Sequence, residues 1–278
     1  MFVRRSFNFA IFALAIQVAV TPATQASSYT LANGNSCVTI DATSQYGMSD
    51  WTVDGVPQLY RQWFWFRNGN TGGEKSLNQL TLQCTQTSDS TLTTYYQSGN
   101  KFSIEVSYSL LGGALGSGSS TIGEQIKITN LGNSVLDFHF FQYVDFDLGG
   151  SNAGDTVQVG QNISGLFDSA YQNKGTAYFA DEFVSPGATH AEVGLYPSIY
   201  NKLNDNSPTT LSDYTGPVTG DATWAFQWDK AIAVGGSLSI SLNKSVYLTA
   251  VPEPTAAVML PVALAMFGIA RRRFSSGK

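Results

Sequence analysis

Apolar and polar residues alternate with a period of two along much of the chain between residues 27 and 249. The alternation is clearest in residues 101–110, where Phe, Ile, Val, Tyr and Leu take every second position and Ser or Glu lie between them. It returns in residues 237–242 and continues with Val246 and Leu248. Because this period places successive side chains on opposite faces of a strand, these segments predict half-buried antiparallel strands.

The same signals predict further short strands, and Gly, Asn and Ser separate them as turn residues. They cover residues 37–40, 59–66, 80–84, 91–96, 125–129, 135–148, 156–159, 177–180 and 223–228. Only residues 198–204 predict a short helix, which argues against βαβ units and a parallel sheet. We therefore expect an all-β fold, a single antiparallel two-sheet β-sandwich over residues 27–250.

A Gly/Ser-rich segment at residues 111–120 has the composition of a phosphate-binding loop. It lacks a lysine at the required offset, and the segment after it is predicted as a strand rather than a helix. We therefore interpret it as a hairpin connection.

Residues 1–26 have the three parts of a secretory signal peptide. Arg4 and Arg5 precede an apolar run at residues 9–20, and small residues lie just before Ser27. The alternative is a membrane anchor, but about a dozen apolar residues are too short to cross a ~30 Å hydrocarbon core. We expect signal peptidase to remove this segment as the chain is exported through the inner membrane.

The other end, residues 251–278, also has three parts. A short motif comes first, an apolar stretch at residues 256–270 follows, and a basic cluster comes last. The motif is Val251, Pro252, Glu253 and Pro254, and the cluster is Arg271, Arg272 and Arg273. The apolar stretch predicts a hydrophobic transmembrane helix, and the arginines should stay cytoplasmic and stop export. This tail would be the chain's only contact with the membrane.

This tail resembles the PEP-CTERM sorting signal of Gram-negative bacteria, and the Pro-Glu-Pro at residues 252–254 matches it in full. The resemblance implies recognition and cleavage by an exosortase, followed by release or attachment at the cell surface. Such proteins are common in bacteria that make exopolysaccharide. An ordinary single-helix anchor is the alternative, and it would not require the Pro-Glu-Pro motif.

The charge of the body differs from that of the whole chain. Six of the fifteen basic residues lie in the two end segments, so residues 27–254 carry nine basic residues against twenty acidic ones. An acidic body argues against nucleic acid as a partner.

Cys37 and Cys84 are the only cysteines. An even number in an exported chain favours a disulfide, which would close a loop of about 48 residues and stabilise by roughly 4 kcal/mol. Two unpaired thiols are the alternative. A zinc site is not expected, because no ligand spacing links the cysteines to His139 or His190.

The most suggestive candidate site lies in residues 137–155. Alternation places five residues on one face of a strand: His139, Phe141, Tyr143, Asp145 and Asp147. We expect this face to be open to solvent and the opposite face, with Phe138, Phe140, Val144 and Phe146, to be core. The open face could stack a sugar on an aromatic ring and bind its hydroxyls through carboxylates, or it could bind calcium with help from Asp155. Strand-end aspartates that merely cap a turn are the alternative.

A second candidate face lies in residues 59–67, where Arg61, Trp63, Trp65 and Arg67 alternate with other bulky residues. It predicts a cation-π ladder on the outer face of a sheet, a platform for glycans, or aromatic residues that belong to the core.

Recognisable catalytic motifs are absent from the sequence: there is no G-x-S-x-G elbow, no H-E-x-x-H helix and no nucleotide fingerprint. We therefore expect a non-enzymatic cell-surface or matrix protein that binds exopolysaccharide and needs no cofactor. Two alternatives stay open. One is a carbohydrate-active enzyme that uses Asp145, Asp147 or His139 as acid and base, and the other is an adhesion module that binds calcium through residues 145–155.

Overall fold

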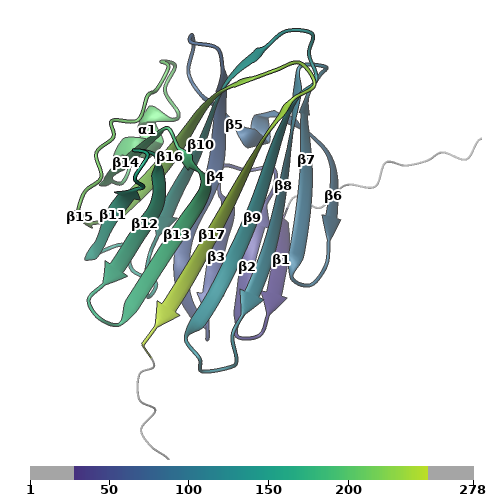
Figure 1. The fold of residues 1–278 in the computed structure, drawn as a ribbon. Helices are drawn as coiled ribbons and strands as arrows, with labels where there is room; N and C mark the ends of the chain where they lie inside the picture. The colour runs from purple at the N-terminus through teal and green to yellow at the C-terminus, as the bar shows by residue number, and fades with distance from the viewer. Residues whose placement is uncertain (1–27, 250–278) are drawn as a thin grey trace, which may run out of the picture.

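Two antiparallel sheets face each other in the computed structural model, which describes residues 28–249 (Figure 1). The predicted signal peptide, sorting motif, apolar tail and arginine cluster lie outside the described residues. Within residues 28–249, no helix has both the length and the apolar character that crossing a membrane requires.

Sheet A has its strands in the order β1, β2, β3, β4, β10, β16 and β14, and a short strand, β5, pairs with β4. Their bounds are β1 Ser28–Asn33, β2 Ser36–Asp41, β3 Gly47–Val53, β4 Val56–Asn68, β5 Lys75–Ser76, β10 Leu136–Phe146, β14 His190–Leu195 and β16 Ala222–Ile232.

Sheet B has the order β15, β11, β12, β13, β17, β9, β8, β7 and β6. Their bounds are β6 Thr81–Thr87, β7 Thr91–Ser98, β8 Phe102–Gly112, β9 Ser119–Asn130, β11 Asp155–Gln161, β12 Phe167–Lys174, β13 Tyr178–Ala188, β15 Val218–Gly220 and β17 Ser237–Leu248. The described helices are η1 (Leu77–Gln79) and α1 (Ser198–Lys202). The predicted β-sandwich is confirmed, and the Gly/Ser-rich segment joins β8 to β9.

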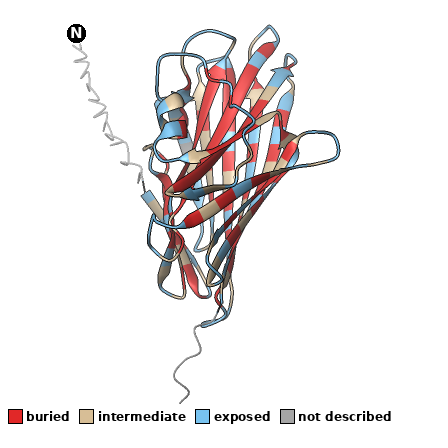
Figure 2. Cartoon of the chain, turned by 90° about the vertical axis from the view of Figure 1, so that its left-hand side faces the viewer, coloured by how far each residue is buried: buried red, intermediate tan, exposed pale blue. Residues whose placement is uncertain are grey.

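The core lies between the two sheets, where their inward apolar side chains meet (Figure 2). Aromatic rings dominate the sheet A side: Phe64 stacks on Phe140 with ring centroids 5.4 Å apart, and Phe146 stacks on Trp224 at 5.6 Å. All five tryptophans of the chain are fully buried. The residues predicted as core on β10 are buried as expected.

A polar network also crosses this core. The Lys244 ammonium lies 2.5 Å from a carboxylate oxygen of Glu124 and 2.9 Å from one of Glu182, and all three side chains are fully buried. Neutral donors pair the remaining carboxylate oxygens: Gln62 donates to Glu124, and Gln142 and Trp224 donate to Glu182. Burial raises the pKa of Glu124 and the nearby ammonium opposes that rise, whereas burial alone would lower the pKa of Lys244 and the two carboxylates raise it.

The predicted disulfide between Cys37 and Cys84 is not present. Cys37 is a free thiol, and its sulfur lies 3.1 Å from the hydroxyl oxygen of Thr52 on the neighbouring strand β3. The direction of the Cys37 side chain gives the reason: Cys37 alternates with the core residues Val38 and Ile40 on β2, so it lies on the outer face of sheet A and points away from sheet B, which carries Cys84 on β6.

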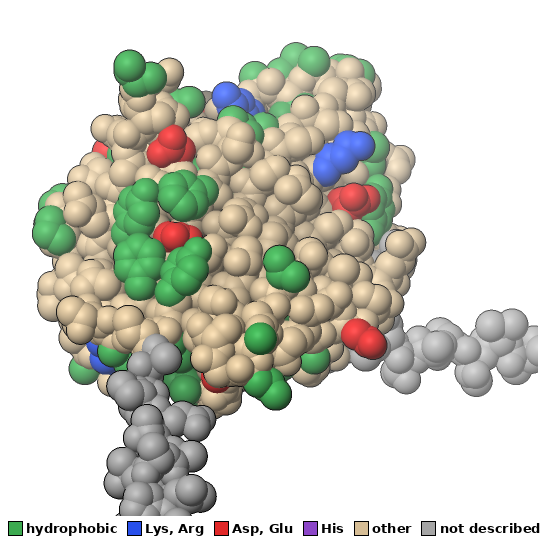
Figure 3. Space-filling model, turned by 60° about the horizontal axis from the view of Figure 1, so that its bottom comes forward, with side chains coloured by type: hydrophobic (Ala, Val, Ile, Leu, Met, Phe, Trp, Pro, Cys, Tyr) green, Lys and Arg blue, Asp and Glu red, His purple; other side chains and the backbone are tan. Residues whose placement is uncertain are grey.

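The outer faces of the two sheets differ. On sheet A, α1 and the segment that follows it pack over β14 and β16, and Tyr200 makes an edge contact with Trp65. As a result, β10 is buried on both faces from Phe138 to Phe146. The outer face of sheet B has no such cover in the described chain, and a cluster of hydrophobic side chains is visible on the surface there (Figure 3).

Candidate functional site

Three aspartates meet at one end of the outer face of sheet A. Asp145 lies near the end of β10, Asp147 lies in the turn that follows, and Asp221 immediately precedes β16. One carboxylate oxygen from each lies within 4.8 Å of the others, an arrangement that could hold a metal ion. Together with Tyr60, Asn152 and Tyr196, they line a hollow of about 220 Å³, which we call the acidic pocket.

Two local irregularities build this pocket. Asp145 pairs with Arg61 but Phe146 pairs with Leu59, so Tyr60 is the extra residue of a β-bulge. A bulge re-aims side chains, and Tyr60 here points to the surface beside the aspartates.

The second irregularity is the turn after β10. Gly149 and Gly150 adopt positive φ angles of 70° and 75°, which glycine adopts without strain. A Cβ atom on Gly149 would lie 2.8 Å from the ring of Tyr178. The turn leads to Asn152, whose amide donates to Asp221 at 3.3 Å and so connects the two segments that carry the aspartates.

Two carboxyl groups of this pocket, those of Asp145 and Asp147, have raised pKa values and so hold protons more tightly than ordinary aspartates. Burial raises the pKa of Asp145 to about 7, although the Tyr143 hydroxyl donates to its Oδ2 at 3.0 Å and acts in the opposite direction. Burial and the charge of Asp221 raise the pKa of Asp147. The other oxygen of Asp145, Oδ1, is buried and has no hydrogen-bond partner. A carboxyl group that titrates near neutral pH suits proton transfer.

Arg61 lies beside the pocket, enclosed by aromatic rings. Its Nε is 3.9 Å from Asp145 Oδ2, and its guanidinium carbon is 4.0 Å from the ring centroid of Tyr200. Three further rings surround the guanidinium at 5.3–5.6 Å, those of Tyr60, Tyr143 and Tyr196. The cation is therefore held by rings and a single carboxylate.

The structure divides the residues that the sequence grouped together. Asp145 and Asp147 belong to the acidic pocket, and the buried Tyr143 is connected to it by its hydrogen bond to Asp145. His139 lies six residues earlier on β10, about 20 Å away at strand rise, where its Nδ1 is 2.6 Å from Asp229. Asp229 also lies 3.5 Å from His190 Nε2, so both histidines of the chain share one carboxylate.

Asp155 does not join the acidic pocket either. It lies on β11 of sheet B, fully buried, with its nearest charged partner, the Lys174 ammonium, at 3.8 Å. Burial raises its pKa to about 7, and Lys174 opposes the rise.

The prediction that the outer face of β10 is open to solvent was wrong. His139, Tyr143 and Asp145 are all buried, because Tyr200 packs against Tyr143 and the backbone of Leu211 bonds to Gln227. Sequence reasoning missed Tyr60, Asn152, Tyr196 and Asp221 as site residues. The bulge leaves no sequence signal, and Asp221 resembles any aspartate in a Gly-Asp turn.

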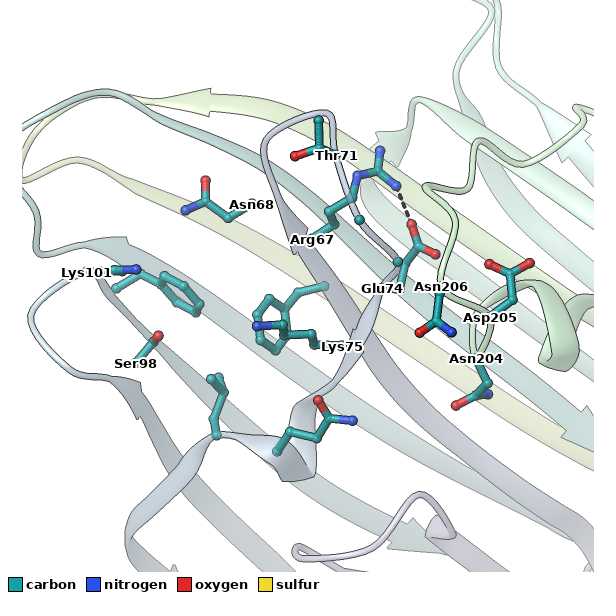
Figure 4. Close-up of a pocket in the computed structure, with 16 residues that line it drawn as sticks. Arg67, Asn68, Thr71, Glu74, Lys75, Ser98, Lys101, Asn204, Asp205 and Asn206 are labelled. Carbon is teal, nitrogen blue, oxygen red and sulfur yellow. Dashed lines mark hydrogen bonds and ion pairs between the residues drawn. The ribbon is translucent and has the colours of Figure 1, made fainter.

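A larger hollow, of about 800 Å³, lies at the opposite end of β4 (Figure 4). Its walls are mostly polar: Asn68, Thr71, Gln79, Ser98, Asn204 and Asn206, with the lysines Lys75 and Lys101. Its acidic residues are Glu74 and Asp205, and Arg67 forms an ion pair with Glu74. A second hollow of about 730 Å³ shares Asn68 and Lys101 with it, so the two form one polar groove.

Comparisons with known proteins identify the fold. No protein-family model matches the chain, and no curated protein matches it. Among solved structures, a bacterial glucoamylase complexed with acarbose matches 80% of this chain at 10% identity and a TM-score of 0.58. A galactose mutarotase related enzyme from Lactobacillus acidophilus matches 81% at 8% identity and 0.53, and a GalM/aldose epimerase homologue from C. elegans matches 80% at 7% identity and 0.50.

The extent of these matches differs. The chain covers 99% of the mutarotase related enzyme and of the epimerase homologue, but only 32% of the glucoamylase. At these identities the likeness shows a shared fold. All three neighbours carry the names of carbohydrate-active enzymes, which contradicts the expectation of a non-enzymatic matrix protein.

Proposed function

We propose that the chain is a carbohydrate-active enzyme and that the acidic pocket is its active site. The observation that carries this proposal is the buried Asp145, which titrates near neutral pH and has an unpartnered oxygen in a hollow shared with two other carboxyl groups. Tyr60 and Tyr196, each 39% exposed, offer ring faces on which a sugar can stack.

The chemistry that fits is mutarotation, in which protons are transferred at the two oxygens bonded to the anomeric carbon of a free sugar. Protonated Asp145 gives its proton to the ring oxygen while ionised Asp147 takes the proton of the anomeric hydroxyl, so the bond between the anomeric carbon and the ring oxygen breaks. The open-chain aldehyde rotates, and the ring closes as the two groups exchange roles. The products differ from the reactants only in the configuration of the anomeric carbon.

Glycoside hydrolysis fits this pocket less well. The closest carboxylate oxygens here lie within 4.8 Å, which argues against an inverting glycosidase, with its carboxyl groups about 6.5–9.5 Å apart, but not against a retaining one, with about 5–5.5 Å. The argument against hydrolysis is the volume of about 220 Å³, which is below the ~300 Å³ at which pockets for drug-sized ligands begin. The pocket therefore suits one sugar ring rather than two linked ones.

A mutarotation assay tests the proposal. Freshly dissolved α-D-galactose or α-D-glucose is mixed with the full-length protein, and the change in optical rotation is recorded by polarimetry. We expect catalysis that Asp145→Asn and Asp147→Asn each reduce by 10²-fold or more, in keeping with general acid-base catalysis. Asp89→Asn, in the exposed turn between β6 and β7, is the matched control. Unchanged rates in folded Asp145→Asn protein would refute the assignment.

A cation in the same pocket is a second candidate. Three carboxylates and the Asn152 amide are hard oxygen ligands of the kind that calcium prefers. Calcium should then raise the melting temperature, and Asp221→Asn should abolish the rise. If calcium has no effect up to ~10 mM, which is roughly tenfold above the Kd of the weakest extracellular calcium sites, this candidate fails.

We also propose that the protein acts outside the cell, after signal peptidase removes residues 1–26 and an exosortase cleaves near Pro252–Pro254. The support is the sequence of the two ends. Intact-mass measurement on protein from the native host tests it, and a recovered chain that still carries Arg271 to Arg273 would contradict it.

The partner proposed for this location is exopolysaccharide, bound in the polar groove. Amide side chains there can bond sugar hydroxyls, and Lys75 and Lys101, which form no ion pair in the described residues, can bind acidic sugars. Lys75→Gln with Lys101→Gln should weaken retention on an acidic polysaccharide column, whereas Lys127→Gln with Lys230→Gln should not.

A further inference from the structure

Four aromatic side chains surround one aspartate on the outer face of sheet B, and we call this group the aromatic patch. Tyr171 on β12, Phe179 and Phe183 on β13, and Tyr247 on β17 are 37–47% exposed. In the strand register, Asp181 lies between the two phenylalanines on β13, opposite Tyr171 on one side and Ser245 on the other. Figure 3 shows hydrophobic side chains gathered around an acidic group on this face.

The rings contact one another but are not coplanar. Tyr171 lies 6.4 Å from Phe179 at an interplanar angle of 38°, and 5.9 Å from Phe183 at 83°. Phe179 lies 6.1 Å from Tyr247 at 39°. A platform that stacks the flat faces of a polysaccharide needs rings in one plane. Rings tilted against one another instead form the walls of a shallow cage.

The aspartate in this cage lacks a cation. Asp181 forms no ion pair with any described residue, and its Oδ1 is buried without a hydrogen-bond partner. Burial raises the pKa of Asp181, and hydrogen bonds from Ser245 oppose the rise. A bound cation would favour the ionised form. The ring faces carry negative potential as well, so carboxylate and rings attract the same kind of group.

We propose that the aromatic patch is a binding site for a quaternary ammonium group. A primary ammonium is strongly hydrated and needs direct contact with several oxygen acceptors, but Oδ1 of Asp181 is buried. A methylated ammonium is apolar at its surface, so it can pack against the rings while the Asp181 carboxylate attracts its positive charge. This site does not depend on the acidic pocket, because it lies on the other sheet.

Choline is the probe, titrated into the full-length protein and followed by ligand-observed NMR. We expect saturable binding at least tenfold tighter than that of 3,3-dimethylbutan-1-ol, its neutral isostere, and of ethanolamine, its primary ammonium counterpart. Asp181→Asn should weaken choline binding on the order of tenfold, because it removes the charge at nearly constant volume.

Ring loss is tested separately by Phe183→Leu, which keeps an apolar side chain at the surface and should also weaken binding severalfold. Tyr214→Leu, at an exposed tyrosine outside the patch, is the matched control. Equal binding of choline and its neutral isostere would reduce the patch to an apolar surface and overturn the proposal. No saturable binding, or choline affinity unchanged in Asp181→Asn, would also overturn it.

Discussion

Buried carboxylates occur in two regions of this molecule, and the two regions treat them in opposite ways. In the core, all four carboxylate oxygens of Glu124 and Glu182 have partners, and an ammonium joins the two groups. In the acidic pocket, three aspartates face one another, and an oxygen of Asp145 has no partner. The two core carboxylates are therefore fully paired within the chain, although the side-chain carbonyl oxygens of Gln62 and Gln142 have no partner, whereas the aspartates of the pocket need a proton, a cation or a substrate.

The difference separates a structural charge cluster from a functional one. Fully paired carboxylates connect the two sheets and leave no charge for a ligand to neutralise. An unsatisfied cluster stores unfavourable desolvation and like-charge repulsion, which a ligand can relieve. Perturbed carboxyl groups mark functional sites for this reason.

The largest expected effect comes from breaking the core network. Lys244→Met should lower the free energy of unfolding by about 3–5 kcal/mol at pH 7, because it leaves two buried carboxylates without their cation. Urea unfolding measures this. Adding Glu124→Gln and Glu182→Gln should recover much of the loss, and if the triple variant is as unstable as Lys244→Met, packing rather than charge explains the effect.

A moderate effect is expected from Asp145→Asn in the acidic pocket, where the substitution should raise rather than lower the free energy of unfolding above neutral pH. Because the pKa of Asp145 rises from 3.8 to about 7 on folding, the folded state holds the proton more tightly, and stability falls as the pH rises from about 4 to about 7. Asp145→Asn lacks this decline, so it should be more stable than the parent at pH 8, relative to their difference at pH 4, by up to about 4 kcal/mol, which is about three pKa units at ~1.4 kcal/mol each. Parallel stability curves for the two proteins would contradict the assignment.

A smaller effect is expected from Tyr143→Phe. The Tyr143 hydroxyl donates to Asp145 and favours its ionised form, so its removal should move the pKa of Asp145 further upward. Carboxyl carbon NMR shifts followed against pH measure this. In a plot of mutarotation rate against pH, the alkaline limb should move to higher pH in the variant. A downward shift in the pKa of Asp145 would show that the Tyr143 hydroxyl does not donate to it.

The smallest expected effect concerns covalent cross-links, which neither region requires. Because Cys37 is a free thiol, a reducing agent should leave the melting temperature unchanged within about 1 °C, whereas loss of a disulfide would lower it by several degrees. Thiol labelling of unfolded, non-reduced protein should modify Cys37 fully. A labelled fraction near zero would show instead that Cys37 forms a disulfide.

The sequence by itself determined the fold class and the two faces of each clear strand. Alternation of apolar and polar residues fixes which side chains share a face, and the structure keeps the predicted inward and outward sets of β10. The same pattern also indicates the core network. Lys244, Glu124 and Glu182 each occupy an apolar position of an alternating strand, where a charge must find a buried partner.

Only the tertiary structure decided which faces are covered and which aspartates meet. Burial of the outer face of β10 depends on where α1 and the segment after it pack, and that contact joins residues far apart in the chain. Asp221 reaches Asp145 because β16 pairs with β10, and Tyr60 turns outward because of a bulge one residue long. Periodicity reports the local direction of a side chain, whereas covering, pairing and bulging are long-range events that a local pattern does not contain.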